Sequence, residues 1–207
     1  MPPPSPKSAS RARARQRRAA LEPGVRAELD RRIGAHLLNW SIEHPCRRLA
    51  AYWPVRGEVD LRPALYELAA AGREIYLPCL NGEAPGVMTF RRWAAAPGEA
   101  GMTPNRYGIP EPLTGARCPV AGLDLVLVPL LAFSADGARL GSGAGYYDRA
   151  LAGRSAPPPL IAGVAYGLQE VDQVPQDPWD IPLEAVLTDR GLWHFAAAPH
   201  PPQVTGR

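Results

Sequence analysis

The sequence of 207 residues predicts an α/β fold: a single three-layer domain with a mainly parallel sheet flanked by helices, preceded by a basic N-terminal helix. Two observations favour this class. Short apolar runs alternate with helical segments along the chain, and one run, LDLVLVP, is almost entirely apolar, as expected for a central strand covered on both faces. The domain is predicted over residues 7–198, between disordered tails at 1–6 and 199–207.

Three helices are predicted before the middle of the chain. Residues 10–21 are mostly good helix formers, and Pro23 suits the first turn of a second helix that ends near Trp40. The apolar face of this second helix repeats every four residues, at Val25, Leu29, Ile33 and Leu37. A third helical spacing covers residues 61–71 and stops at Gly72.

Apolar runs bounded by turn residues are candidate strands. They cover residues 48–55, 74–80, 88–93, 123–133, 160–166, and 185–188 leading into 192–195. The helix at 61–71 separates the first two runs, which gives a β-α-β unit. Such units pair their strands in parallel.

Charge is divided unevenly along the chain. Residues 1–20 hold six basic residues and no acid, whereas the remaining 187 residues carry 17 bases against 20 acids and sum to −3. Lys7 is the only lysine among 23 basic residues. A basic arm could contact RNA or act as an organelle transit peptide. The acidic body lacks an aromatic and basic strand motif of the RNA-binding kind, so nucleic acid is not an expected partner.

Composition excludes several other classes. The longest apolar run, 123–133, has 11 residues and is interrupted by Asp and Pro, which is too short for a membrane span. Cys46, Cys79 and Cys118 are odd in number and widely spaced, so they indicate neither a disulfide framework nor a zinc site. We expect a cytoplasmic protein, with a monomer favoured.

A glycine-rich segment, GARLGSGAGYYDR at 137–149, follows the most apolar strand. Gly141, Gly143 and Gly145 alternate, and a helix can begin at Tyr146. Strand, glycine loop and helix in this order present backbone N–H groups to phosphate oxygens. The segment has neither the lysine of a Walker A motif nor the spacing of a dinucleotide fingerprint. A structural turn with glycines at positive φ is the alternative.

Two charged residues flank this loop. Arg139 beside it suits a phosphate group, and Asp148 at its far end suits Mg²⁺. A sugar-phosphate enzyme that needs no ATP would carry the same features.

The loop resembles the R-L-G-x-G-x-G-Y-Y-D signature of 5-formyltetrahydrofolate cyclo-ligases, also called methenyltetrahydrofolate synthetases. Further segments match this family in the same order over residues 7–195. They are K-x-x-x-R at Lys7 and Arg11, WPVRGE from Trp53, YLPCL, YGIPEP from Tyr107, VPLLAF before the loop, and VPQDPWDIPLEAVLT at 174–188.

This resemblance implies an enzyme that uses ATP and Mg²⁺ to close 5-formyltetrahydrofolate, with or without a polyglutamate tail, into 5,10-methenyltetrahydrofolate. ADP and phosphate are released. Phosphorylation of the formyl oxygen would turn it into a leaving group, and N10 would then attack the activated carbon. Such a protein must hold two anionic reactants in line while offsetting the charge of the moving phosphoryl group.

The resemblance also implies roles for individual residues. The ATP phosphates would be bound by Lys7, Arg11, Arg139, Leu140, Gly141, Ser142, Gly143, Ala144, Gly145, Tyr146 and Tyr147. Asp148 and Asp180 would hold Mg²⁺. The folate would be bound by Trp53, Glu58, Tyr107 and Tyr146, with Trp53 stacked on the pterin and Glu58 accepting hydrogen bonds from its N–H edge.

Several of these positions have structural alternatives. Trp53 could be a core residue, Glu58 could serve the start of the helix at 61–71, and Asp180 could cap a turn. The arginines between 13 and 18 are expected to form a solvated helix face.

The glycine loop also departs from the family pattern. Ser142 stands where many relatives carry Arg or Met, and Ala144 where some carry Lys. Contacts made by those longer side chains would have to come from another residue here, whereas the backbone contacts of the loop would be kept.

Overall fold

The computed structural model describes residues 6–95, 100–152 and 159–195. Its helices are α1 (Pro6–Ala19), α2 (Pro23–Glu43), α3 (Arg62–Ala70) and α4 (Tyr146–Ala152), with 3-10 turns η1 (Val120–Gly122) and η2 (Gly167–Gln169). Its strands are β1 (Arg48–Ala50), β2 (Glu74–Cys79), β3 (Thr89–Arg92), β4 (Met102–Pro104), β5 (Pro110–Pro112), β6 (Arg117–Cys118), β7 (Leu125–Pro129), β8 (Ala132–Phe133), β9 (Arg139–Leu140), β10 (Leu160–Val164), β11 (Ala185–Thr188) and β12 (Gly191–His194).

The main sheet has 8 strands in the order β12-β11-β10-β7-β1-β2-β3-β6. Strands β11, β10, β7, β1 and β2 pair in parallel with their neighbours. The pairs β11–β12, β2–β3 and β3–β6 are antiparallel. Two short antiparallel hairpins, β4–β5 and β8–β9, lie outside this sheet.

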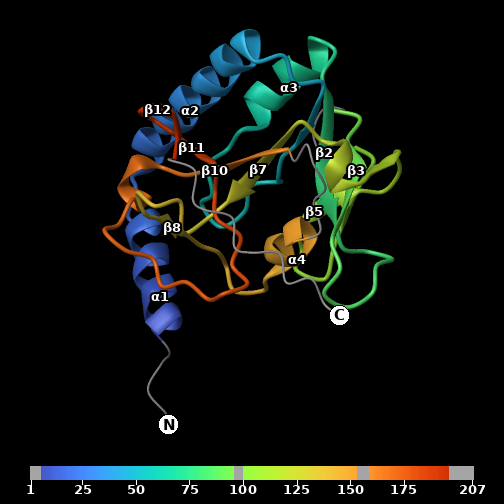
Figure 1. The fold of residues 1–207 in the computed structure, drawn as a ribbon. Coiled ribbons are helices and arrows are strands. Elements are labelled where there is room, and N and C mark those ends of the chain that lie inside the picture. The colour runs from blue at the N-terminus through green and yellow to red at the C-terminus, as the bar shows by residue number, and fades with distance from the viewer. Residues whose placement is uncertain (1–5, 96–99, 153–158, 196–207) are drawn as a thin grey trace.

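Helices cover both faces of the sheet (Figure 1). On one face, Leu37 of α2 and Leu65 of α3 pack in a core that includes Leu127 of β7. On the other face, Leu151 of α4 packs in a second core that includes Val128 of β7. Adjacent residues of β7 point into different cores, as the period of a strand requires. The predicted three-layer α/β class is therefore confirmed.

The chain leaves the main sheet earlier than the apolar pattern predicted. Residues 123–133 do not form one strand, because β7 ends at Pro129 and β8 belongs to a separate hairpin. Proline supplies no N–H for a ladder. The next carbonyls are bonded by a side chain instead, since Gln169 Nε2 donates to the oxygens of Leu130 at 2.8 Å and Leu131 at 3.1 Å.

The hairpin of β4 and β5 was not predicted, because three of its six strand residues are proline, which is unfavourable in a strand. A buried carboxylate anchors the hairpin to the end of β2. Glu111 is 2% exposed, and its two oxygens accept the backbone N–H groups of Leu80 and Asn81, each at 2.8 Å. This anchor sets where the hairpin lies beside the sheet.

Cys46, Cys79 and Cys118 are buried and carry free thiols. Within the described ranges, the helices lack the length and apolar character needed to cross a membrane. The predicted tails lie outside the described residues, except that Pro6 already begins α1.

Replacing Leu127 by Ala should lower the free energy of unfolding by about 2–5 kcal/mol, because this side chain is 0% exposed between α2, α3 and the sheet. Leu113→Ala, at a position that is 58% exposed, should change it by less than about 0.5 kcal/mol. Urea unfolding followed by circular dichroism measures both. A Leu127→Ala loss as small as that of the control would contradict the assigned core.

Candidate active site

The strand order diverges at β1, which pairs with β2 on one side and with β7 on the other. In open α/β sheets, ligands bind beyond the carboxyl ends of the strands at such a point. The segment after β1 carries Trp53 and Glu58, and the chain after β7 leads through the β8–β9 hairpin to the glycine loop, residues 141–145. The predicted site therefore has two halves, the segment after β1 and the glycine loop reached from β7. Both lie beyond the carboxyl ends of neighbouring strands.

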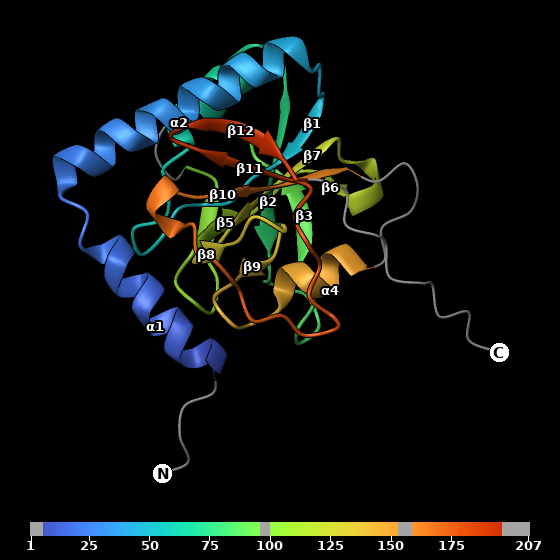
Figure 2. The same cartoon turned by 60° about the vertical axis from the view of Figure 1, so that its left-hand side comes forward.

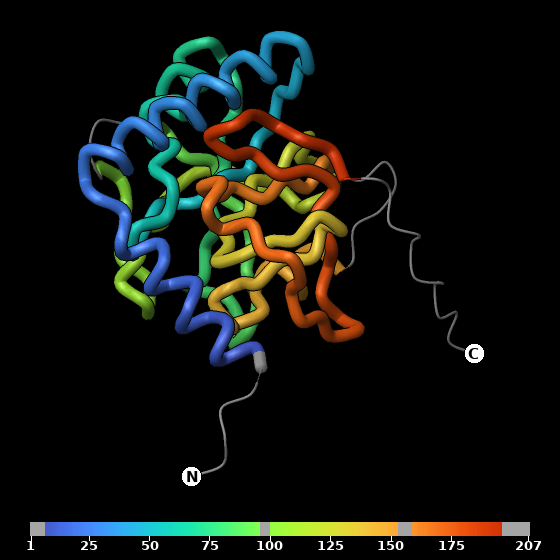
Figure 3. The backbone as a smooth tube through the Cα atoms, turned by 90° about the vertical axis from the view of Figure 1, so that its left-hand side faces the viewer, coloured from blue at the N-terminus to red at the C-terminus, as the bar shows by residue number. Residues whose placement is uncertain are grey.

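Helix α1 lies against the glycine loop as a separate rod beside the body (Figures 2 and 3). Arg11 Nε donates to the carbonyl of Gly141 at 3.0 Å, and Arg15 Nη2 donates to that of Ser142 at 3.2 Å. Residues four apart share one helix face. The basic arm is thus docked on the predicted phosphate loop.

Lys7 lies at the start of this face, between two carboxylates. Its Nζ is 2.6 Å from Oδ2 of Asp177 and 2.6 Å from Oδ2 of Asp180. Burial alone would lower the pKa of Lys7, but hydrogen bonds and charge attraction from the two carboxylates outweigh burial and raise the pKa above its ordinary value. Asp180 also accepts the N–H of Asp177 at 2.8 Å, so it closes a turn as well as holding the lysine.

Arg18 corrects the expectation of a solvated helix face. Arg13 and Arg17 are exposed, but Arg18 is only 5% exposed. Its guanidinium donates to the carbonyl of Arg56 at 3.0 Å and to that of Leu130 at 3.4 Å. It therefore bridges the segments that follow β1 and β7. The available signal was its spacing of seven residues from Arg11, which places both on one helix face.

Glu58 closes a tight turn rather than capping a helix. Arg56 and Gly57 have φ of 53° and 75°, which puts both in the left-handed region. The Glu58 N–H bonds to the carbonyl of Val55 at 3.0 Å, and Glu58 Oε2 accepts the Val55 N–H at 3.1 Å. Burial raises the pKa of Glu58, while this N–H and the charges of Arg18 and Arg56 act in the opposite direction.

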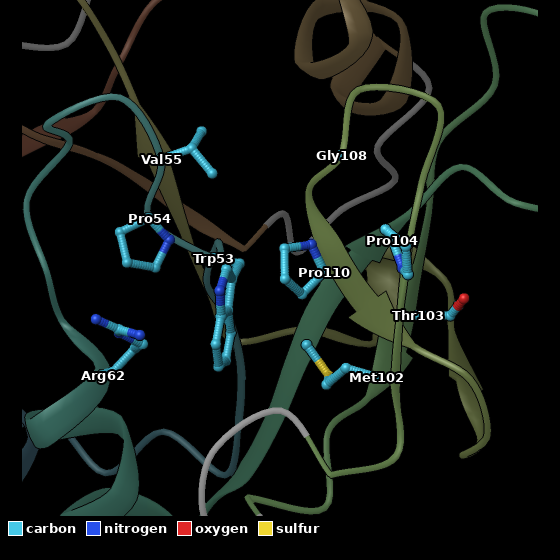
Figure 4. Close-up of a pocket in the computed structure, with 9 residues that line it drawn as sticks. All are labelled: Trp53, Pro54, Val55, Arg62, Met102, Thr103, Pro104, Gly108 and Pro110. Atoms are coloured by element: carbon cyan, nitrogen blue, oxygen red, sulfur yellow. The ribbon is translucent and has the colours of Figure 1, made fainter.

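Trp53 is both a core residue and a pocket wall. It is 6% exposed and packs edge-on against Trp93, with ring centroids 5.8 Å apart. The Arg62 guanidinium lies 5.3 Å from its ring centroid. A pocket of about 390 Å³ separates the segment 53–55 from the β4–β5 hairpin (Figure 4). Glu58 does not line this pocket, although the Val55 to which it bonds does.

The tip of the β4–β5 hairpin reaches the start of α4. Asn105 Oδ1 shapes the tip by accepting the N–H groups of Tyr107 at 2.9 Å and Ile109 at 3.2 Å. The hydroxyls of Tyr107 and Tyr146 are 3.3 Å apart, and their rings pack edge to face at 6.2 Å. The structure thus brings these two predicted folate residues together.

Arg139 is held by protein groups within the site. It is 8% exposed, and its Nη2 donates to Asp148 Oδ1 at 2.7 Å while Nη1 donates to the carbonyl of Ile181. The Ile181 N–H donates to the same Asp148 oxygen at 3.1 Å. Because Ile181 follows Asp180, these bonds bring together the segments that carry the two predicted metal ligands. Arg139 thereby positions Asp148.

The glycine loop needs glycine at two positions, because the backbone there has positive φ. Gly143 and Gly145 have φ of 110° and 68°. A Cβ at residue 143 would also lie 3.3 Å from the guanidinium carbon of Arg11. Leu140 is 2% exposed in a core cluster, so the backbone is the part of this residue that can serve a ligand.

Tyr147 presents an unsatisfied hydroxyl. Among the described residues, its buried oxygen has no hydrogen-bond partner. Burial raises the pKa of Tyr147, and the charge of Glu58 raises it further. A buried hydroxyl normally has a partner, so this donor is available to a ligand.

Comparisons with known proteins identify the family of this chain. Residues 4–189 match the model of the 5-formyltetrahydrofolate cyclo-ligase family. The 5-formyltetrahydrofolate cyclo-ligase of Escherichia coli (strain K12) is 32% identical over 183 residues, which cover 87% of this chain and 99% of the relative. The Haemophilus influenzae enzyme of the same name is 30% identical, with 84% and 92% covered.

Solved structures give the same result. The 5,10-methenyltetrahydrofolate synthetase of Aquifex aeolicus superposes with a TM-score of 0.75 and 30% identity, over 97% of this chain and 99% of that one. The Mycoplasma pneumoniae synthetase gives a TM-score of 0.72 and 26% identity, with 89% and 99% covered. Sequence, fold and the ordered motifs around the glycine loop agree, and the chain belongs to the 5-formyltetrahydrofolate cyclo-ligase family.

Proposed function

We propose that this enzyme uses ATP to convert 5-formyltetrahydrofolate into 5,10-methenyltetrahydrofolate, a ligase reaction of folate one-carbon metabolism, as its family membership implies. The observation that carries the proposal is the meeting of two unlike half-sites at one edge of the sheet. A glycine loop with docked cations follows β7, and an aromatic-walled pocket follows β1.

The chemistry proceeds in two steps. The formyl oxygen attacks the γ-phosphorus of ATP, so that a P–O bond to this oxygen forms while the bond to ADP breaks. The N10 lone pair then attacks the activated carbon, N10 loses its proton, and phosphate leaves with the former formyl oxygen. The protein contributes mainly by holding both reactants in line and by offsetting the charge of the phosphoryl group.

On the nucleotide side, Lys7 and Arg11 of α1 and the loop 139–147 bind the phosphates. The bond between Arg11 and Gly141 supports this assignment, because it joins the helix to the loop. Lys7 keeps a third N–H donor beyond its two carboxylate bonds. Arg139 acts by holding Asp148 in place.

Asp148 and Asp180 suit a Mg²⁺ ion that is shared with phosphate. The described residues contain no cluster of three or more metal-ligating side chains, but Mg²⁺ on nucleotides commonly needs only one or two carboxylates. The bonds of Asp148 use Oδ1 and those of Asp180 use Oδ2, which leaves one oxygen of each outside these contacts. When bound, the ion would neutralise phosphate charge.

On the folate side, the pocket beside Trp53 receives the pterin. Tyr107 lies next to the pocket-lining Gly108 and contacts Tyr146 of α4. The buried, unpartnered hydroxyl of Tyr147 supports a ligand near Glu58, because a polar group of the ligand would satisfy it. Glu58 would accept hydrogen bonds from the pterin N–H edge.

The proposal is tested by mixing the purified protein with 5-formyltetrahydrofolate, Mg²⁺ and ATP and following the near-ultraviolet absorbance of the methenyl product. We expect the product only when ATP is present. Turnover of a sugar phosphate without ATP, in place of the methenyl product, would favour the alternative of a sugar-phosphate enzyme. No turnover, together with salt-sensitive RNA binding that is lost on deletion of residues 1–20, would favour the RNA-binding alternative.

Lys7→Ala should raise the KM for ATP about tenfold or more, because a charge-assisted bond to phosphate is lost. Lys7→Arg should not restore the wild-type KM, since a guanidinium spreads its donors over a plane. Arg17→Ala, which removes an exposed charge from the same helix, is the matched control and should leave the KM near wild type. An unchanged KM in Lys7→Ala would refute the role of Lys7.

The KM for 5-formyltetrahydrofolate should rise as the pH is lowered, beginning above the pH at which an ordinary glutamate protonates. Burial raises the pKa of Glu58, and the neutral carboxyl accepts pterin N–H bonds poorly. Glu58→Gln should have a high KM that is flat over this range. Arg18→Met should move the rise to higher pH, because the charge of Arg18 lowers the pKa of Glu58.

Glu67→Gln, at an exposed position of α3, is the control for this pH profile and should behave as the wild type. A Glu58→Gln profile that still follows the wild-type pH dependence would exclude Glu58 as the titrating group.

A further inference from the structure

The glycine loop lacks cations of its own. Its sequence from Gly141 to Gly145 is GSGAG, without a charged side chain. Transfer of a phosphoryl group requires positive charge directed at the oxygens that carry the developing negative charge. The cation that meets the moving phosphoryl group must therefore come from outside the loop.

The arginines nearest the loop already have acceptors. Arg139 binds Asp148. Arg149 Nη2 and Nε donate to the carbonyls of Ala144 at 2.8 Å and Gly86 at 2.9 Å. Arg11, assigned above to the ATP phosphates, and Arg15 each donate to a loop carbonyl. These contacts shape the loop.

Arg106 differs from these residues in both position and partners. It lies at the tip of the β4–β5 hairpin, and residues on both sides of it, Pro104 and Gly108, line the Trp53 pocket. Its Nη2 donates to the hydroxyl of Tyr146, the residue that directly follows the glycine loop. Arg106 thus joins the hairpin tip beside the pocket to the start of α4.

The guanidinium of Arg106 keeps its charge available. It is 5.5 Å from the ring centroid of Tyr107 and 5.6 Å from that of Tyr146. Aromatic rings hold a guanidinium without neutralising it. Within the part of the chain that the structure describes, Arg106 forms no ion pair with a carboxylate, whereas Arg139 is paired with Asp148.

The hairpin tip is also well anchored. Asn105 bonds to two backbone N–H groups within the tip, and the buried Glu111 ties β5 to the end of β2. A side chain on such a support needs little reorganisation when a ligand arrives.

We propose that Arg106 is a catalytic residue that binds the phosphoryl group while it passes from ATP to the formyl oxygen of the folate. This inference rests on the proposed function. In that step the bond between the γ-phosphorus and ADP breaks as the bond to the formyl oxygen forms, and Arg106 donates N–H bonds to the phosphoryl oxygens without changing its own protonation.

The test compares Arg106→Gln and Arg106→Lys with Arg92→Gln, which removes an exposed charge from β3. We expect Arg106→Gln to lower kcat about 10²-fold, with the folate KM within about threefold of wild type. Arg106→Lys should recover part of the loss. Arg92→Gln should match the wild type. Circular dichroism and thermal melting check that each variant is folded.

A binding measurement makes the inference independent of turnover. Calorimetry with ADP and with a non-hydrolysable ATP analogue separates the γ-phosphoryl group from the rest of the nucleotide. Arg106→Gln should weaken the analogue about tenfold and leave ADP unchanged. If the wild type forms no methenyl product, the proposed function fails, whereas this comparison still decides whether Arg106 meets the γ-phosphoryl group.

Two results would overturn the inference. Equal kcat and equal affinity for the analogue in Arg106→Gln would mean that Arg106 meets no phosphoryl group. An unchanged kcat with a raised folate KM, larger for a triglutamate than for a monoglutamate substrate, would assign Arg106 to the carboxylates of the folate tail instead.

Discussion

The guanidinium of Arg18 joins the three parts of the site, because it donates from α1 to carbonyls in the segments after β1 and β7. These two segments leave neighbouring parallel strands, and divergent strand order alone would not set their separation. Arg18 sets it with two bonds from one rigid group. The same side chain lies near the half-buried Glu58 and partly compensates its charge. Docking of the helix, the spacing of the two segments and the electrostatics around Glu58, on the proposed folate side, are therefore coupled.

Local patterns predicted those parts of the site that local chemistry determines. The run of apolar residues in β7 and the helix between β1 and β2 were sufficient for a parallel sheet, and the alternating glycines marked the loop that follows. Gly143 is required for two reasons. Its positive φ is a local constraint of the loop, whereas the close approach of Arg11 depends on the tertiary fold. The presence of the loop could thus be predicted from the sequence, whereas the residue packed against it could not.

Features that depend on distant partners escaped prediction. Arg18 resembles its exposed neighbours in sequence, and its burial becomes visible only once α1 is docked against Leu130. The β4–β5 hairpin has strands rich in proline, and its position depends on Glu111, a carboxylate whose partners lie about 30 residues away. Arg139 fits a phosphate ligand by pattern, yet in the fold it supports Asp148. Each residue type was compatible with two roles, and the tertiary partner selects between them.

The lone lysine follows from the geometry at the start of α1. An ammonium carries three donors on one nitrogen, so two carboxylates and a phosphate oxygen can meet at a single point. Lys7 Nζ already lies 2.6 Å from each of two carboxylates and keeps its third donor. A guanidinium distributes five donors over a plane and suits separate, spaced acceptors, which is how Arg11, Arg15 and Arg18 bind carbonyls along the same helix. Arginine therefore suits the positions where α1 donates hydrogen bonds to separate carbonyls of the domain. Lysine suits the position where several oxygens converge on one nitrogen.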